Sequence, residues 1–98
     1  MSWTVIVEHE SGEPVKRLPD EFWLSHTDVL CDGSFKLLHY LDPNGDTTFN
    51  ALMFDDLIVD LAHLKIKLPT DGTRIDDVLA LVLECKKEVH TYLKFYGD

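Results

Sequence analysis

The sequence predicts a single α+β domain in which an antiparallel sheet of three or four strands is followed by an antiparallel two-helix hairpin. β-branched and aromatic segments separated by turn signals fill the first half of the chain, and apolar residues at helical spacing fill most of the second half. Strands first and helices second are typical of α+β proteins. The length of 98 residues is that of one domain, so residues 1–98 are taken as one unit.

The predicted strands lie in the first half of the chain. Residues 3–8 are β-branched and aromatic and predict the first strand, and residues 15–18 are expected to return after a Ser-Gly-Glu-Pro turn. Residues 35–41 predict a further strand. Asp-Pro-Asn-Gly-Asp at 42–46 is the strongest turn signal, so a short strand at 47–49 is expected to complete a hairpin.

Two amphipathic helices are predicted after these strands. The first is expected to have Asn50 as its N-cap and to end at Leu68, because a proline follows. A sequence resembling a capping box at residues 73–76 predicts the start of the second helix, whose apolar face continues to Tyr92. The pattern of residues 93–98 fits a helix end and a closing strand equally, and residues 19–34 carry no clear pattern.

The charge balance narrows the range of partners. The chain has 18 acidic residues against 9 Lys and Arg, for a net charge of −9. A negative field repels phosphates and attracts basic proteins, so we expect a protein partner with a basic surface and no nucleic acid. No stretch of about 18 apolar residues is present, so we expect no membrane insertion. Two cysteines without a C-x-x-C motif and no signal-peptide pattern favour the cytoplasm.

The motifs predict neither a metal nor a cofactor. Asp42 to Asp46 begins like a calcium-binding loop, but Thr47 stands where the loop requires glycine and Met53 where it requires glutamate. No two of the five histidines lie three or four residues apart. Ser25 and His26 are adjacent in sequence, which does not establish the geometry of a nucleophile and its base. We therefore predict a protein that is not an enzyme.

Surface residues are the remaining candidates for function. The acidic turn leads directly into the first predicted helix, whose polar face carries further aspartates, so these carboxylates are expected to share one side of the molecule. An ordinary solvated face is an equally acceptable interpretation. An exposed aromatic residue would add an anchor for a partner. The predicted partner-binding residues are Asp42, Asp46, Asp55, Asp56, Asp60 and Trp23.

Two segments, residues 38–50 and 89–98, carry a resemblance to small, acidic, uncharacterised bacterial proteins that covers about a quarter of the chain. In overall character the chain is similar to the immunity proteins that are encoded beside bacterial polymorphic toxins. The resemblance implies a protein that neutralises a cognate toxin by covering a basic site. Two alternatives stay open. One is a regulatory or scaffold domain that self-associates as a homodimer through its helix hairpin, and the other is an enzyme whose site combines distant His and Asp residues.

Overall fold

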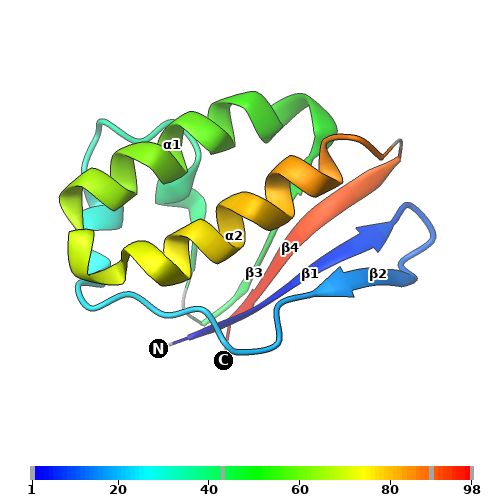
Figure 1. Cartoon of the computed structure of the whole chain (residues 1–98), viewed down its shortest axis with the longest axis horizontal. Coiled ribbons are helices and arrows are strands. Elements are labelled where there is room, and N and C mark those ends of the chain that lie inside the picture. Colours follow the sequence, from blue (N-terminus) through cyan, green and yellow to red (C-terminus); the bar gives the residue numbers. More distant parts are fainter. Residues whose placement is uncertain (1, 43, 89, 98) are drawn as a thin grey trace.

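A computed structural model, which describes residues 2–42, 44–88 and 90–97, has two layers: a four-stranded antiparallel sheet and a pair of helices against one of its faces (Figure 1). The predicted fold class is confirmed. No helix in these residues is long and apolar enough to cross a membrane. The strands are β1 (Trp3–His9), β2 (Pro14–Arg17), β3 (Asp46–Asn50) and β4 (Thr91–Gly97), and the helices are α1 (Phe54–Lys67) and α2 (Gly72–Cys85).

The sheet has the order β2-β1-β4-β3, which places the first and last strands of the chain side by side at its centre. Seven residue pairs join β1 to β4, from Trp3 opposite Gly97 to His9 opposite Thr91. The predicted strands at the start of the chain are confirmed. Of the alternatives left open for residues 93–98, the structure contains the closing strand as far as Gly97, and Asp98 lies outside the described residues.

The predicted hairpin between residues 35–41 and 47–49 is wrong. Residues 35–41 form an irregular segment with a 3₁₀ turn at Leu38–Tyr40, and β3 pairs with β4. The reason lies in the spacing of the buried residues Phe35, Leu38 and Leu41, which recur every three positions. That interval matches a 3₁₀ turn, whereas a strand buries every second residue.

The first helix begins where the sequence predicts. The second begins at Gly72, so Thr73 lies inside it and the predicted capping box at residues 73–76 does not start the helix, which is also shorter than expected. The Asn50 side chain accepts a hydrogen bond of 3.0 Å from the amide of Leu52, which caps a 3₁₀ turn leading into α1. The α1 helix ends at Lys67, in agreement with the prediction. The α2 helix ends at Cys85 and not at Tyr92, because the chain must reverse before β4. Val89 lies outside the described residues.

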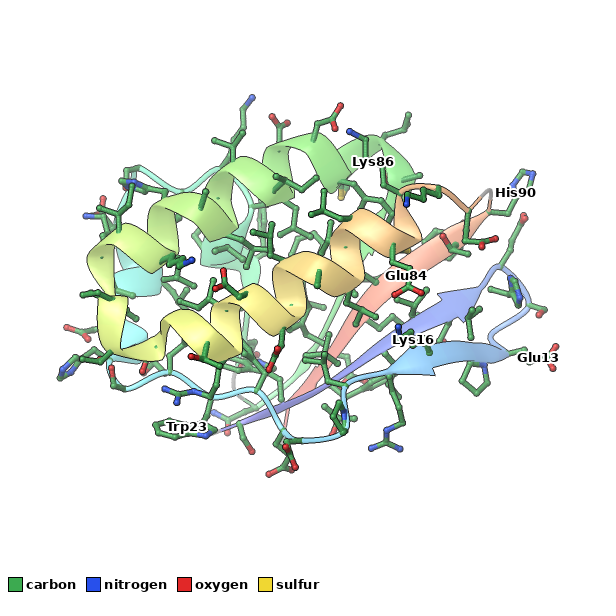
Figure 2. All side chains as sticks on the ribbon, viewed as in Figure 1. Glu13, Lys16, Trp23, Glu84, Lys86 and His90 are labelled. Atoms are coloured by element: carbon green, nitrogen blue, oxygen red, sulfur yellow. The ribbon has the colours of Figure 1, made fainter. Side chains whose placement is uncertain are left out.

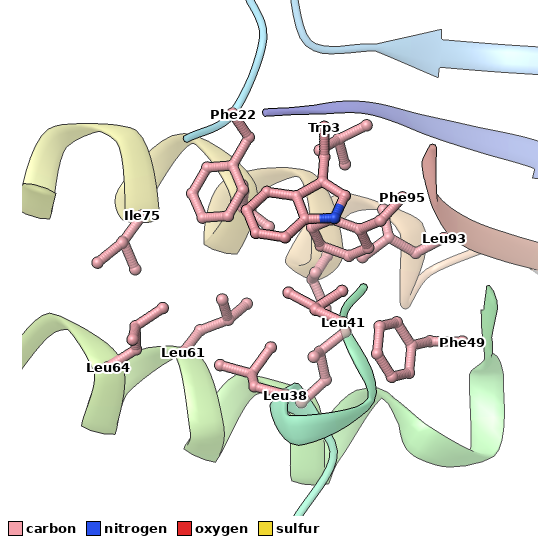
Figure 3. Packing of buried hydrophobic residues seen from close by; sticks show 14 of the residues in the cluster. Trp3, Phe22, Leu38, Leu41, Phe49, Leu61, Leu64, Ile75, Leu93 and Phe95 are labelled. Atoms are coloured by element: carbon pink, nitrogen blue, oxygen red, sulfur yellow. The ribbon is translucent and has the colours of Figure 1, made fainter. Parts of the chain in front are cut away.

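The core fills the space between the sheet and the helices (Figure 3). Its aromatic part joins Trp3 to Phe22, with ring centroids 5.9 Å apart, and Phe49 to Phe95 in an edge-to-face pair at 5.8 Å. Aliphatic side chains from both helices, including Ile75 of α2, close the opposite side. Phe22 therefore anchors the irregular segment after β2 to the core.

The two cysteines differ in their surroundings, and we expect them to differ in reactivity. Cys31 is exposed, whereas Cys85 is buried with its sulfur 3.1 Å from the Thr91 hydroxyl. Burial raises the pKa of the Cys85 thiol, and the hydrogen bond to Thr91 offsets part of this effect. Thiol titration of the native protein should find one fast group, which Cys31→Ser removes. A Cys31–Cys85 disulfide in the purified protein would contradict this prediction.

Candidate functional site

Two loops that carry acidic residues meet at the N-terminal end of β1. Trp3 exchanges two backbone hydrogen bonds of 2.8 Å with Phe22, and its indole donates to the carbonyl of Asp42 at 3.0 Å. Burial alternates along the first loop, so that Phe22 and Leu24 point inward while Glu21 and Trp23 point outward. Trp3 therefore fixes both segments at this end of the sheet, one through its backbone and the other through its indole.

Four acidic residues lie on the segments that meet at this end of the sheet, which we call the acidic end. Across the sheet, Thr4 of β1 lies opposite Tyr96 of β4, which in turn lies opposite Asp46 of β3. None of the four pairs with Lys, Arg or His within the described residues, although seven of the nine basic side chains form ion pairs elsewhere. Negative charge therefore stays uncompensated here. The acidic end consists of Asp20, Glu21, Asp42 and Asp46.

Trp23 lies at a corner of the molecule beside the start of α2 (Figure 2). Its side chain is 46% exposed, and the guanidinium of Arg74 lies 3.6 Å from the centre of its ring. The Arg74 Nε also donates to the backbone carbonyl of Trp23 at 3.0 Å. Arg74 thus holds one side of the indole while much of the ring remains in solvent. Large aromatic side chains in this state are frequent anchors of protein interfaces.

Asp71 fixes the loop that carries Trp23 to the start of α2. Its buried carboxylate accepts hydrogen bonds from the Ser25 amide at 2.9 Å, from the Ser25 hydroxyl at 2.8 Å, and from Arg74. Burial alone would raise the Asp71 pKa, but these donors and the Arg74 charge hold it below its ordinary value of 3.8. The Ser25 hydroxyl therefore donates its proton to the hydrogen bond with Asp71, and His26 does not activate it.

A cleft of about 250 Å³ opens between the loop and α2. Trp23 and Arg74 form part of its wall, and the carboxylates of Asp20, Glu21 and Asp77 also line it. Neither Asp20 nor Asp77 has a basic partner among the described residues, and Glu21 accepts a hydrogen bond from the Ser2 hydroxyl at 3.1 Å. An indole beside several carboxylates that have no basic partner among the described residues suits an arginine or lysine side chain. We call this the Trp23 cleft.

The expectation that all the predicted aspartates share one side is wrong. Asp42 and Asp46 belong to the acidic end, but Asp55 and Asp56 lie beyond the other end of β3, about 13 Å along the strand. Asp55 pairs with Lys86 at 2.6 Å, and Asp56 lies 3.5 Å from the nitrogen of Lys36. Intramolecular partners therefore offset both charges. Of the six predicted residues, the structure brings Asp42, Asp46 and Trp23 to the same end.

Asp60 is not a surface residue. It is only 4% exposed, and its carboxylate accepts three backbone hydrogen bonds, from Lys36 at 3.2 Å, Leu37 at 2.6 Å and Leu38 at 3.1 Å. These bonds satisfy the amides of the irregular segment before β3. The sequence contained a signal for this position, because Asp60 follows Leu57 by three residues and shares its helix face.

Two further clusters resemble chemical sites without completing one. The Ser34 hydroxyl lies 3.0 Å from His63 Nε2, but no carboxylate orients the other ring nitrogen among the described residues. Glu8 accepts from Tyr96 and from Lys94 at 3.0 Å, so these three groups satisfy one another on the sheet. The Tyr96 hydrogen bond is the main cause that lowers the Glu8 pKa. Within the described residues no group of three potential ligands converges on a metal position.

No protein-family model, no curated protein and no solved structure matches this chain. The fold and the site define a small two-layer α+β protein with an acidic cleft that contains tryptophan.

We expect Asp60→Asn to lower the free energy of unfolding by about 1–3 kcal/mol. In the wild type both carboxylate oxygens accept from backbone N–H groups, whereas the asparagine side chain replaces one of these oxygens with an NH₂ donor. Urea unfolding at neutral pH measures the change. Asp55→Asn is the matched control on the same helix, since its side chain is 79% exposed, and we expect a change within about 0.5 kcal/mol. Equal effects of the two substitutions would contradict the structural role of Asp60.

The lowered pKa of Asp71 predicts how stability depends on pH. Because the folded state holds this carboxyl below its ordinary pKa of 3.8, the unfolded chain binds more protons near that pH. Its contribution is fully present above about pH 5 and is lost as pH falls through the folded-state value. Urea unfolding at several pH values should show that Asp71→Asn has a lower free energy of unfolding than the wild type, and that this difference shrinks as the pH falls. Asp77→Asn should show little deficit at any pH, and a constant Asp71→Asn deficit would refute the assignment.

Proposed function

We propose that this protein is a non-catalytic binding protein, and that the Trp23 cleft and the acidic end receive a basic surface of a protein partner. The observation that carries the proposal is the half-exposed Trp23 ring beside Asp20, Glu21 and Asp77, which have no basic partners among the described residues. The indole supplies apolar contact and a cation-binding ring face, while the carboxylates provide attraction and orientation.

The position of Trp23 supports a preformed site. Arg74 and Asp71 hold the loop from inside the molecule, so binding would order few new groups. Buried Phe22 holds the neighbouring backbone against β1. A partner would therefore meet a rigid aromatic anchor, which is typical of residues that dominate interface energies.

The resemblance to immunity proteins suggests a toxin with a basic active site as the first partner class to test. In that arrangement the carboxylates of the Trp23 cleft would take the positions of substrate phosphates, and the bound protein would exclude the substrate. Asp42 and Asp46 would then contribute to attraction more than to close contact, because they lie outside the cleft.

The test uses a hexa-arginine peptide as a stand-in for the basic surface, with calorimetric titration as the measurement. We expect saturable 1:1 binding that weakens about tenfold or more in Trp23→Ala. Trp23→Phe should retain most of the affinity because it keeps an aromatic ring. The triple variant Asp20→Asn, Glu21→Gln, Asp77→Asn should bind weakly and with little salt dependence between about 50 and 500 mM, where screening becomes strong.

A matched control separates this site from net charge alone. The triple variant Glu10→Gln, Glu13→Gln, Glu88→Gln removes the same formal charge. Figure 2 places Glu13 and His90, the ion-pair partner of Glu10, at the end of the molecule opposite Trp23. We expect this control to bind the peptide with less than a threefold loss. An equal loss of peptide affinity in both triple variants, or an unchanged affinity in Trp23→Ala, would contradict the proposed site.

A further inference from the structure

The α1 helix carries large aliphatic residues on the side that faces away from the core. Val59 is 66% exposed and Ile66 is 78% exposed, and Leu52, in the turn before the helix, is 93% exposed. An interval of seven residues corresponds to about two helical turns, so Val59 and Ile66 lie on the same side of α1, and Leu52 precedes Val59 by the same interval. We call Leu52, Val59 and Ile66 the α1 stripe.

This stripe makes α1 apolar on two sides. Leu57, Leu61 and Leu64 are fully buried against the core, whereas the three residues of the α1 stripe are exposed. The α1 helix itself lies at the edge of the molecule (Figure 1). A helix of a two-layer protein needs one apolar side, and single exposed aliphatic residues are ordinary. Two such residues on α1 and a third in the turn that leads into it form an unpartnered apolar face.

We propose that the α1 stripe is the contact of a homodimer in which two α1 helices pack antiparallel across a two-fold axis at Val59. The stripe is self-complementary, because Leu52 and Ile66 lie seven residues on either side of Val59. The axis therefore places Leu52 of one copy against Ile66 of the other, and each Val59 meets its own equivalent, as an isologous interface requires.

The charges at the two ends of α1 select the antiparallel orientation. The first turn carries Asp55 and Asp56, and the last turn carries Lys65 and Lys67. All four have intramolecular partners, yet their side chains remain between 31% and 79% exposed. Antiparallel packing about Val59 brings the acidic turn of one helix within about one turn of Lys65 and Lys67 of the other, whereas parallel packing opposes like charges.

The dimer should be weak, because three aliphatic side chains per copy make an interface smaller than those of obligate dimers. Sedimentation equilibrium of the full chain between about 10 µM and 1 mM should show a concentration-dependent dimer. Val59→Glu places two like charges on the axis and should abolish it. Val15→Glu, at an exposed valine of β2, is the matched control and should leave the dimer intact.

A wild-type protein that is monomeric at every concentration overturns the proposal, and so does an equal loss of the dimer in Val59→Glu and Val15→Glu. Circular dichroism should show that both variants fold, since both positions are exposed. The Val59→Glu variant should still bind hexa-arginine, because the Trp23 cleft does not include α1.

Cysteine crosslinking tests the orientation directly. In a Cys31→Ser background, Val59→Cys should form a disulfide dimer under mild oxidation, because the two positions meet on the axis. Leu52→Cys alone and Ile66→Cys alone should crosslink poorly, while a mixture of the two should crosslink readily. Efficient crosslinking of each single variant with itself, and none in the mixture, would indicate parallel helices and overturn the antiparallel dimer.

Discussion

Pairing of the first strand with the last is the constraint on which the rest of this structure depends. β4 lies between β1 and β3, so the β1–β2 hairpin and β3 belong to one sheet only after β4 is in place. The pairing also positions Trp3, whose backbone and indole hold the loops on either side. Contacts between the two ends of a chain are the most costly in loop-closure entropy, so the acidic end of the molecule forms from non-local contacts.

Buried carboxylates hold the long irregular connections to the helices. Asp60 binds backbone amides of the segment before β3, and Asp71 binds Ser25 in the segment after β2. Hydrogen bonds to a charged group contribute about 1.5–3 kcal/mol each in such settings. The acidic residues thus serve two purposes: some replace missing backbone partners inside the protein, and others, including Asp20 and Asp46, leave its surface negative.

The two proposed surfaces are separate and compatible with each other. The Trp23 cleft lies between the loop after β2 and the start of α2, whereas the α1 stripe consists of exposed residues of α1 and of the turn before it. A dimer would present two copies of the cleft to a basic partner. Two linked sites raise overall affinity through effective concentration when the partner spans both. Binding and self-association would then reinforce each other without sharing a residue.

Local sequence alone determined β1, β2, the cap at Asn50 and the extent of α1, because alternation, helical spacing and capping depend on neighbouring residues. It also made Trp23 and the aspartates of the acidic turn candidate binding residues, and the fold brings them to one end of the molecule. Only the tertiary structure decided that residues 35–41 are not a strand, that β3 pairs with β4, and that Asp60 is buried. The helix places Asp60 on the face of Leu57, but a separate segment supplies the amides that make burial of a charge favourable. Such partners come from distant parts of the chain, and only the folded structure brings them together.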